Sequence, residues 1–165
     1  MTEVVEISDL LVKPQCFCLN QHPSHPFSNL FVGDETLYLR SDVDEQLLIN
    51  LVFRTTVRLH ALNFVAPDDE SAPTGIKLFT NLQNPGFSDV EDVEPVQKLL
   101  LEPSDFHPDH KTNLKLVKFL HVNSLTIYVD ENGGEEFSTL SGLKIYGHAL
   151  DSVNVAAIHE RRNEE

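Results

Sequence analysis

The most informative stretch of the chain is Gln46-Leu47-Leu48-Ile49-Asn50-Leu51-Val52-Phe53. It is apolar at all but two positions, which is typical of a β-strand that is covered on both faces or lies at the centre of a sheet. Residues 57–64 follow closely and alternate between apolar and polar side chains, which predicts a second strand with one buried face. We expect Thr55 and Thr56 to form the turn between these two strands.

The rest of the chain repeats this pattern of short apolar runs separated by Pro, Gly, Asn and Asp. Such punctuation indicates strands and turns, and it leaves helix only near residues 104–107, where Ser104 could cap a turn, and in a tail from Asp151 onward. About eight short strands favour an all-β fold, a jelly-roll β-sandwich, with Phe119 and Ile127 facing its core. The further strands are expected at residues 37–40, 75–80, 96–101, 116–121, 125–130 and 140–147.

Charge limits the classes of partner. The 165 residues include 12 Lys and Arg against 26 Asp and Glu, a formal charge of −14. Such a chain repels phosphate backbones and anionic lipid surfaces, so neither nucleic acid nor membrane is an expected partner. The two cysteines, Cys16 and Cys18, are too close in sequence for a structural disulfide, which favours a reducing compartment.

The length fits one domain. We expect a flexible N-terminal segment at residues 1–14, the domain at 15–150 and a C-terminal tail at 151–165. The first nine residues include three acids and no basic region, unlike a secretory signal, and no window reaches the roughly 18 apolar residues of a membrane span. These features lead us to expect an intracellular monomer.

A zinc site is the first metal hypothesis, from Cys16, Cys18, His22 and His25. Structural zinc sites use cysteines separated by two to four residues, whereas one residue separates this pair, so loop cysteines packed under the sandwich are the preferred interpretation. The redox motif Cys-x-x-Cys is also absent.

Two further clusters carry possible ligands. His107, Asp109 and His110 could hold a transition metal only if they converge, and a solvated loop is preferred. The acidic residues at 42–45 lack the glycine and the distal glutamate of an EF-hand, which favours an acidic turn before the strand. We expect no metal and no cofactor.

Catalytic patterns are weak. Glu135 and Glu136 are adjacent on a predicted turn, where carboxylates usually point into water. Ser138 and Ser141 lack the spacing of a nucleophile elbow. Trp, the commonest platform for stacking a sugar ring, is absent from the chain. A binding module is therefore preferred to an enzyme.

Several blocks of the sequence follow one another in a recognisable order. In chain order they are Cys18-Leu19-Asn20, Ser41-Asp42-Val43-Asp44-Glu45-Gln46-Leu47-Leu48-Ile49, Ile76-Lys77-Leu78-Phe79-Thr80-Asn81-Leu82, Val117-Lys118-Phe119, Val122-Asn123-Ser124-Leu125-Thr126-Ile127-Tyr128-Val129, Gly133-Gly134-Glu135-Glu136 and Ile145-Tyr146-Gly147. These blocks resemble the PITH domain, the C-terminal proteasome-interacting domain of thioredoxin-like proteins. The resemblance runs from about residue 15 to residue 147.

The resemblance implies a jelly roll similar to galactose-binding-like domains, and docking on the regulatory particle of the 26S proteasome in cytoplasm and nucleus. It implies no catalytic residues. Two-domain members of the family also have an N-terminal thioredoxin domain, which this sequence lacks; it is expected to be either a stand-alone protein or a fragment of a longer one.

The acidic loops are the candidate partner-binding residues, because loops on a rigid frame present side chains at little ordering cost. The alternative for these loops is solubility alone. Two other functions remain open: a small-ligand or carbohydrate-binding jelly roll, and a metal-assisted hydrolase using the His107 cluster. The candidate partner-binding residues are Asp68, Asp69 and Glu70 in one loop and Asp89, Glu91, Asp92 and Glu94 in another, with the segment after Gly147 as a further contributor.

Overall fold

The computed structural model describes residues 4–34 and 36–150. In these residues strands dominate, and the helical elements are single 3₁₀ turns. The turns are η1 (Ser8–Leu10), η2 (Lys13–Gln15), η3 (Phe27–Phe31), η4 (Phe87–Asp89), η5 (Pro103–Phe106) and η6 (Leu116–Lys118). The strands are β1 (Val5–Glu6), β2 (Phe17–Leu19), β3 (Leu39–Arg40), β4 (Leu47–Val65), β5 (Pro73–Thr80), β6 (Gln97–Leu100), β7 (Thr112–Asn113), β8 (Val122–Asn132), β9 (Thr139–Leu140) and β10 (Gly142–Ala149).

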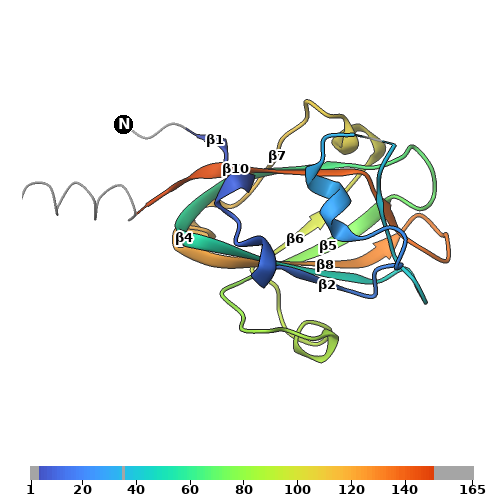
Figure 1. Ribbon diagram of the computed structural model, residues 1–165, viewed down its shortest axis with the longest axis horizontal. Helices are drawn as coiled ribbons and strands as arrows, with labels where there is room; N and C mark the ends of the chain where they lie inside the picture. Colours follow the sequence, from blue (N-terminus) through green and yellow to red (C-terminus); the bar gives the residue numbers. More distant parts are fainter. Residues whose placement is uncertain (1–3, 35, 151–165) are drawn as a thin grey trace, which may run out of the picture.

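The strands form two packed layers, and β4 belongs to both (Figure 1). The first half of β4 lies between β8 and β2, and β5 and β6 extend that layer beyond β8. The second half lies between β10 and β7, and β1 adds to the outer edge of β10. All pairings are antiparallel, and a short β3–β9 pair stands apart. The result is the expected jelly-roll β-sandwich.

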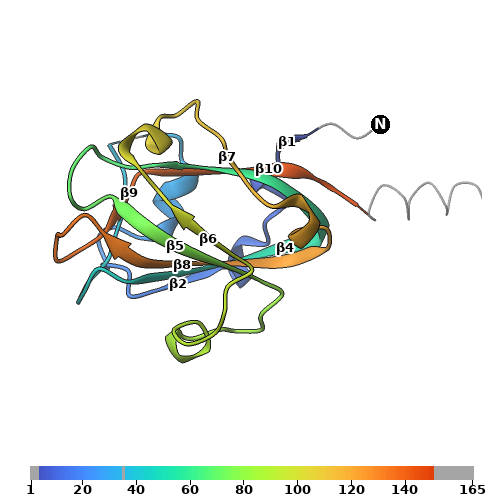
Figure 2. The same ribbon diagram turned by 180° about the vertical axis from the view of Figure 1, so that it is seen from behind.

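The change of layer occurs within a continuous strand. The β4–β8 register shifts between Val52 and Val57, where β4 bends across the edge of the sandwich (Figure 2). The expected turn at Thr55 and Thr56 is therefore wrong: both residues are part of the 19-residue strand. A bulge accommodates the bend without reversing the chain, so each half can pair within its own layer.

The core lies between the layers. Leu47, Ile49 and Leu51 of β4 point into it and are fully buried. Phe119 and Ile127 are also fully buried, which confirms the prediction that they face the core. Apolar side chains on both inner faces exclude water from this space, which is the main source of stability in such a sandwich.

The outer face of β4 is also covered, at a second and smaller cluster. Leu48 packs there with Phe79, Val90 and Tyr128. Val90 lies in the β5–β6 loop, which folds under the sheet in Figure 1. This loop explains why the first half of β4 is apolar on both faces, as the sequence indicated.

Two other predictions need correction. Residues 116–121 do not form a strand: Phe119 N donates to Leu116 O and closes the turn η6. Of the apolar residues in this segment, Phe119 is fully buried, whereas Val117 is 79% exposed. The turn near residue 104 exists as η5, but Asp105 caps it by accepting a hydrogen bond from Glu102 N at 2.7 Å, in place of Ser104.

The N-terminal residues of the chain also differ from the expectation. β1 pairs with β10, and Ile7 and Leu11 are buried in the core, although residues 1–14 were expected to be a flexible segment. The tail expected from Asp151 lies outside the described residues. Among the described residues, no helix has the length and apolar character needed to cross a membrane.

Candidate docking surface

Three loops meet at the end of the sandwich away from β1 and the end of β10 (Figure 1). They connect β3 with β4, β4 with β5, and β8 with β9. We call this region the acidic end, because each loop contains two or three carboxylates. Its acidic residues are Asp42, Asp44 and Glu45, then Asp68, Asp69 and Glu70, then Glu135 and Glu136.

Hydrogen bonds between buried residues join these loops into a rigid unit. Ser138 is fully buried; its N–H donates to Ser41 Oγ at 2.8 Å and its hydroxyl donates to Glu45 O at 2.6 Å. Thr139 N donates to Ser71 O at 2.9 Å. Because the loops share these bonds, the carboxylates are presented on a fixed frame with little ordering left to lose on binding.

Gly133 allows the β8–β9 loop to lie very close to the β4–β5 loop. A Cβ atom on Gly133 would lie 2.9 Å from the backbone oxygen of Glu70, closer than real side chains come. Only glycine therefore lets the β8–β9 loop contact the backbone of the β4–β5 loop.

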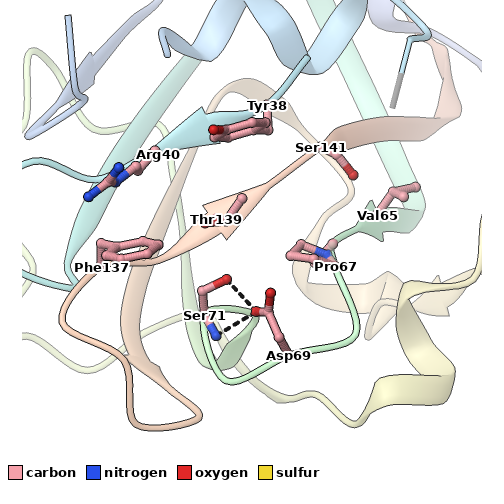
Figure 3. Close-up of a pocket in the computed structure, with 10 residues that line it drawn as sticks. Tyr38, Arg40, Val65, Pro67, Asp69, Ser71, Phe137, Thr139 and Ser141 are labelled. Carbon is pink, nitrogen blue, oxygen red and sulfur yellow. Dashed lines mark hydrogen bonds between the residues drawn. The ribbon is translucent and has the colours of Figure 1, made fainter. Parts of the chain in front are cut away.

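A cleft of about 410 Å³ opens beside these loops (Figure 3). Tyr38 precedes β3, Arg40 belongs to β3, and Phe137 precedes β9, so the β3–β9 pair supplies one wall. Pro67 and Asp69 of the β4–β5 loop form the opposite side. The lining thus combines two aromatic rings with one positive and one negative side chain.

Arg40 is held against an aromatic ring. Its guanidinium carbon lies 3.9 Å from the centre of the Phe137 ring, a cation–π distance. Its Nε is buried and forms no hydrogen bond with the described residues. Opposite, a carboxylate oxygen of Asp69 accepts hydrogen bonds from Ser71 N at 2.8 Å and Ser71 Oγ at 2.5 Å.

The cleft lining offers two aromatic rings, two charged side chains and several hydroxyl groups for contact with a bound molecule. It includes no histidine, cysteine or lysine. Ser138 uses its hydroxyl to fix the loops, and Glu135 and Glu136 are exposed. The aromatic rings and fixed charges can contact a partner's side chains.

The second predicted loop lies elsewhere. Asp89, Glu91, Asp92 and Glu94 are exposed on the β5–β6 loop, which leaves the opposite end of β5 from the β4–β5 loop. The eight residues of β5 span about 26 Å. The structure therefore does not bring the two acidic loops together into one surface.

This second loop is anchored on Tyr128. Phe87 meets its ring edge-on, with ring centres 6.0 Å apart. The pKa of Tyr128 is raised, first by burial and then by the negative charges of Asp130, Glu91 and Asp44. Carboxylates from three segments thus gather around one phenol on the outer face.

The cysteine and histidine pairs do not form a metal site. Cys16 Sγ accepts a hydrogen bond from Val52 N and donates one to Val12 O. Burial raises the pKa of both thiols, that of Cys18 to about 12. His25 stacks on Tyr38 with ring centres 4.3 Å apart. Within residues 4–34 and 36–150, no three His, Cys, Asp or Glu side chains converge as metal ligands.

The His107 cluster is a loop, as preferred from the sequence. His107 and Asp109 are exposed, and His110 Nε2 lies 3.0 Å from a carboxylate oxygen of Asp105. Asp109 N donates to His107 Nδ1 at 3.4 Å. The two contacts engage the side chains of His107 and His110 with partners within or next to η5.

The cleft residues were missed by sequence reasoning. About a hundred positions separate Tyr38 and Arg40 from Phe137, and none of them belongs to a recognisable motif. Only the pairing of Arg40 with Thr139 in the β3–β9 ladder brings them together.

Comparison with known proteins identifies relatives over most of the chain. The model of the PITH domain matches residues 2–163. Thioredoxin-like protein 1 of Schizosaccharomyces pombe is 38% identical over 144 residues, covering 83% of this chain and 49% of that protein. PITH domain-containing protein 1 of Danio rerio is 35% identical over 119 residues, covering 72% and 56%. The chain thus spans about half the length of these relatives.

Solved structures with a similar fold include carbohydrate-binding modules of Clostridium perfringens. The family 32 module of NanJ, in complex with galactose, has a TM-score of 0.55 at 8% identity, covering 87% of this chain and 99% of that one. The structure of the first two such modules of ZmpB with GalNAc has a TM-score of 0.64 at 10% identity, covering 90% and 37%. At this identity the likeness shows a galactose-binding-like fold alone.

Proposed function

This chain belongs to the PITH domain family, and from that premise we propose that it is a non-enzymatic protein-interaction domain that docks on the regulatory particle of the 26S proteasome. The acidic end is the docking surface, and the complementary surface of the partner is basic. Recruitment takes place in the cytoplasm and the nucleus.

The observation that carries this proposal is the rigid union of three carboxylate-bearing loops around a cleft. Hydrogen bonds through Ser138 and Thr139 fix the loops before any partner arrives. Preorganised charge steers association and favours partners of opposite sign. In addition, the cleft offers the aromatic rings of Tyr38 and Phe137 as apolar contacts at the centre of the charged rim.

Capture of purified 26S proteasome on the immobilised chain tests the docking surface. The double variant Asp68→Lys, Glu70→Lys reverses two exposed charges and leaves Asp69, which is bonded to Ser71, in place. We expect binding to fall about tenfold or more, and binding of the parent chain to weaken with added salt.

The variant Asp92→Lys, Glu94→Lys is the matched control, because it makes the same change of charge on the other acidic loop. A loss confined to this control would move the docking surface to the β5–β6 loop. Absence of proteasome capture by the parent chain, or capture that neither variant nor salt changes, would overturn the proposal.

A further inference from the structure

A second cavity lies on the outer face of the β8–β4–β2 layer, between the turn η2 and the start of the β5–β6 loop. Its volume is about 380 Å³, within the range of roughly 300–1,000 Å³ typical of ligand pockets. Amide side chains dominate the lining, and we call this cavity the amide pocket. These side chains belong to Gln15, Asn50, Asn81, Gln83, Asn84 and Asn123.

The amide pocket is uncharged, although the chain has a formal charge of −14. Its other lining residues are Val52, Leu82 and Ser124, so no acidic or basic side chain lines it. A neutral lining gives no advantage to an ion. It favours a ligand that exchanges hydrogen bonds as both donor and acceptor, as an amide group does.

The wall of the pocket is fixed by Asn81. Its Oδ1 accepts hydrogen bonds from Asn123 N at 2.7 Å and Ser124 N at 3.4 Å, and its Nδ2 donates to His121 O at 3.0 Å. The backbone of Asn81 is left-handed, with φ of 61°, which asparagine tolerates better than most residues. These bonds tie the start of the β5–β6 loop to the start of β8 before any ligand binds.

Asn50 forms the floor. It is only 2% exposed, in the middle of the otherwise apolar first half of β4. Within the described ranges its side chain forms one hydrogen bond, accepting at Oδ1 from Thr126 Oγ1 at 2.7 Å. Its Nδ2 therefore has no partner among the described residues, and it remains available as a donor to a molecule in the cavity that Asn50 lines.

Other amide side chains of the pocket also have groups without a hydrogen-bond partner among the described residues. Asn123 uses its Oδ1 to accept from Thr56 Oγ1 at 2.7 Å, which leaves its Nδ2 without a partner among the described residues. The side chains of Gln15 and Gln83 form no hydrogen bonds with the described residues, and both are exposed at the rim. Donors and acceptors thus converge on the cavity from three elements.

We propose that the amide pocket binds an uncharged peptide segment of a partner protein, by hydrogen bonds to its backbone or to Asn and Gln side chains. Asn50 donates to a carbonyl oxygen of that segment, and Val52 and Leu82 contact its apolar atoms. A sugar is the less suitable ligand, because no aromatic side chain lines the pocket to stack on a pyranose ring. This site is separate from the acidic end and does not depend on the proteasome as partner.

A phage-displayed library of random twelve-residue peptides, panned on the full chain, tests this assignment. We expect enrichment of uncharged sequences containing Asn or Gln. Fluorescence polarisation of a selected, labelled peptide should then show that Asn50→Leu weakens binding about tenfold or more. The exposed residue Asn113 on β7 provides the control Asn113→Leu, which should bind like the parent chain.

The double variant Gln15→Ala, Gln83→Ala keeps the test valid if Asn50→Leu does not fold, since both glutamines are exposed and form no hydrogen bonds with the described residues. It should weaken peptide binding severalfold. Failure to select any peptide, or selection of charged peptides whose binding these variants leave unchanged, would overturn the assignment. Glycan-array binding that Asn50→Leu abolishes would overturn the peptide class. Proteasome capture by the Asp68→Lys, Glu70→Lys variant is measured separately, so the two proposals can fail independently.

Discussion

The imidazole rings of His60 and His148 lie 5.1 Å apart, side by side on the second half of β4 and the end of β10. Arg58 is the register partner of His148 on β4. Burial lowers the pKa of both histidines, and the positive charge of Arg58 lowers it further. The side chains of His60, His148 and Arg58 thus form a cluster of basic groups on β4 and β10.

Acid should therefore destabilise the domain. The folded state binds protons at these histidines less readily than the unfolded chain, whose histidine pKa is about 6.5. The free energy of unfolding is therefore highest above pH 6.5, where both rings are neutral, and it falls as the pH drops below about 6.5. Urea unfolding between pH 8 and pH 5.5 should show this decline. The variant His60→Gln, His148→Gln should flatten it, and an equally steep decline in that variant would assign the effect to other groups.

Phe119 is predicted to be a main contributor to the core. Phe119→Ala should lower the free energy of unfolding by about 3–5 kcal/mol, because the side chain is fully buried and leaves a cavity. Val117→Ala is the control on the same turn, since Val117 is 79% exposed, and should change stability by about 0.5 kcal/mol or less. Equal effects in urea denaturation would contradict the burial of Phe119.

Gly147 should tolerate no side chain. A Cβ atom there would lie 2.1 Å from the backbone oxygen of Arg58, at the bulge in the β4–β10 pairing. Gly147→Ala should destabilise the domain by about 3 kcal/mol or more, because the two backbones must separate. Gly86→Ala is the control, with its nearest contact at 3.7 Å. Thermal unfolding of the two variants compares them directly, and similar midpoints would show that β4 and β10 can move apart.

The cysteines should be unreactive in the folded chain. The pKa of Cys16 is raised and that of Cys18 is about 12, so at pH 8 both remain thiols while the thiolate is the reactive form. Iodoacetamide should label neither residue in buffer and both in urea, as read by mass spectrometry. Rapid labelling of Cys18 in the native chain would contradict the burial of its side chain.

The pattern of apolar and polar residues predicted strands well in segments where burial of side chains determines the backbone conformation. The apolar run at residues 46–53 was correctly interpreted as covered on both faces, since Leu48 and Ile49 are buried on opposite sides. It failed at Thr55 and Thr56, because a bend between layers and a hairpin turn have similar local composition. It also failed at residues 116–121, where burial of Phe119 is compatible with a turn.

The candidate sites depended more on topology. The loop at Asp68–Glu70 was identified from charge, but its neighbours at the acidic end became known only from the β3–β9 pairing. The amide pocket had one local signal, the polar Asn50 within an apolar strand. Its other walls come from the turn η2, the β5–β6 loop and the start of β8, and no local pattern connects them.

The passage of β4 through both layers has a mechanical consequence. The first half of β4 is hydrogen-bonded in one layer and its second half in the other. Because the strand is continuous, the two layers cannot separate completely unless β4 leaves one of them. Removing β4 would break hydrogen bonds in both layers together. A motor that unfolds the chain from one end would therefore meet its greatest resistance at residues 47–65, and loss of this strand would unfold both layers.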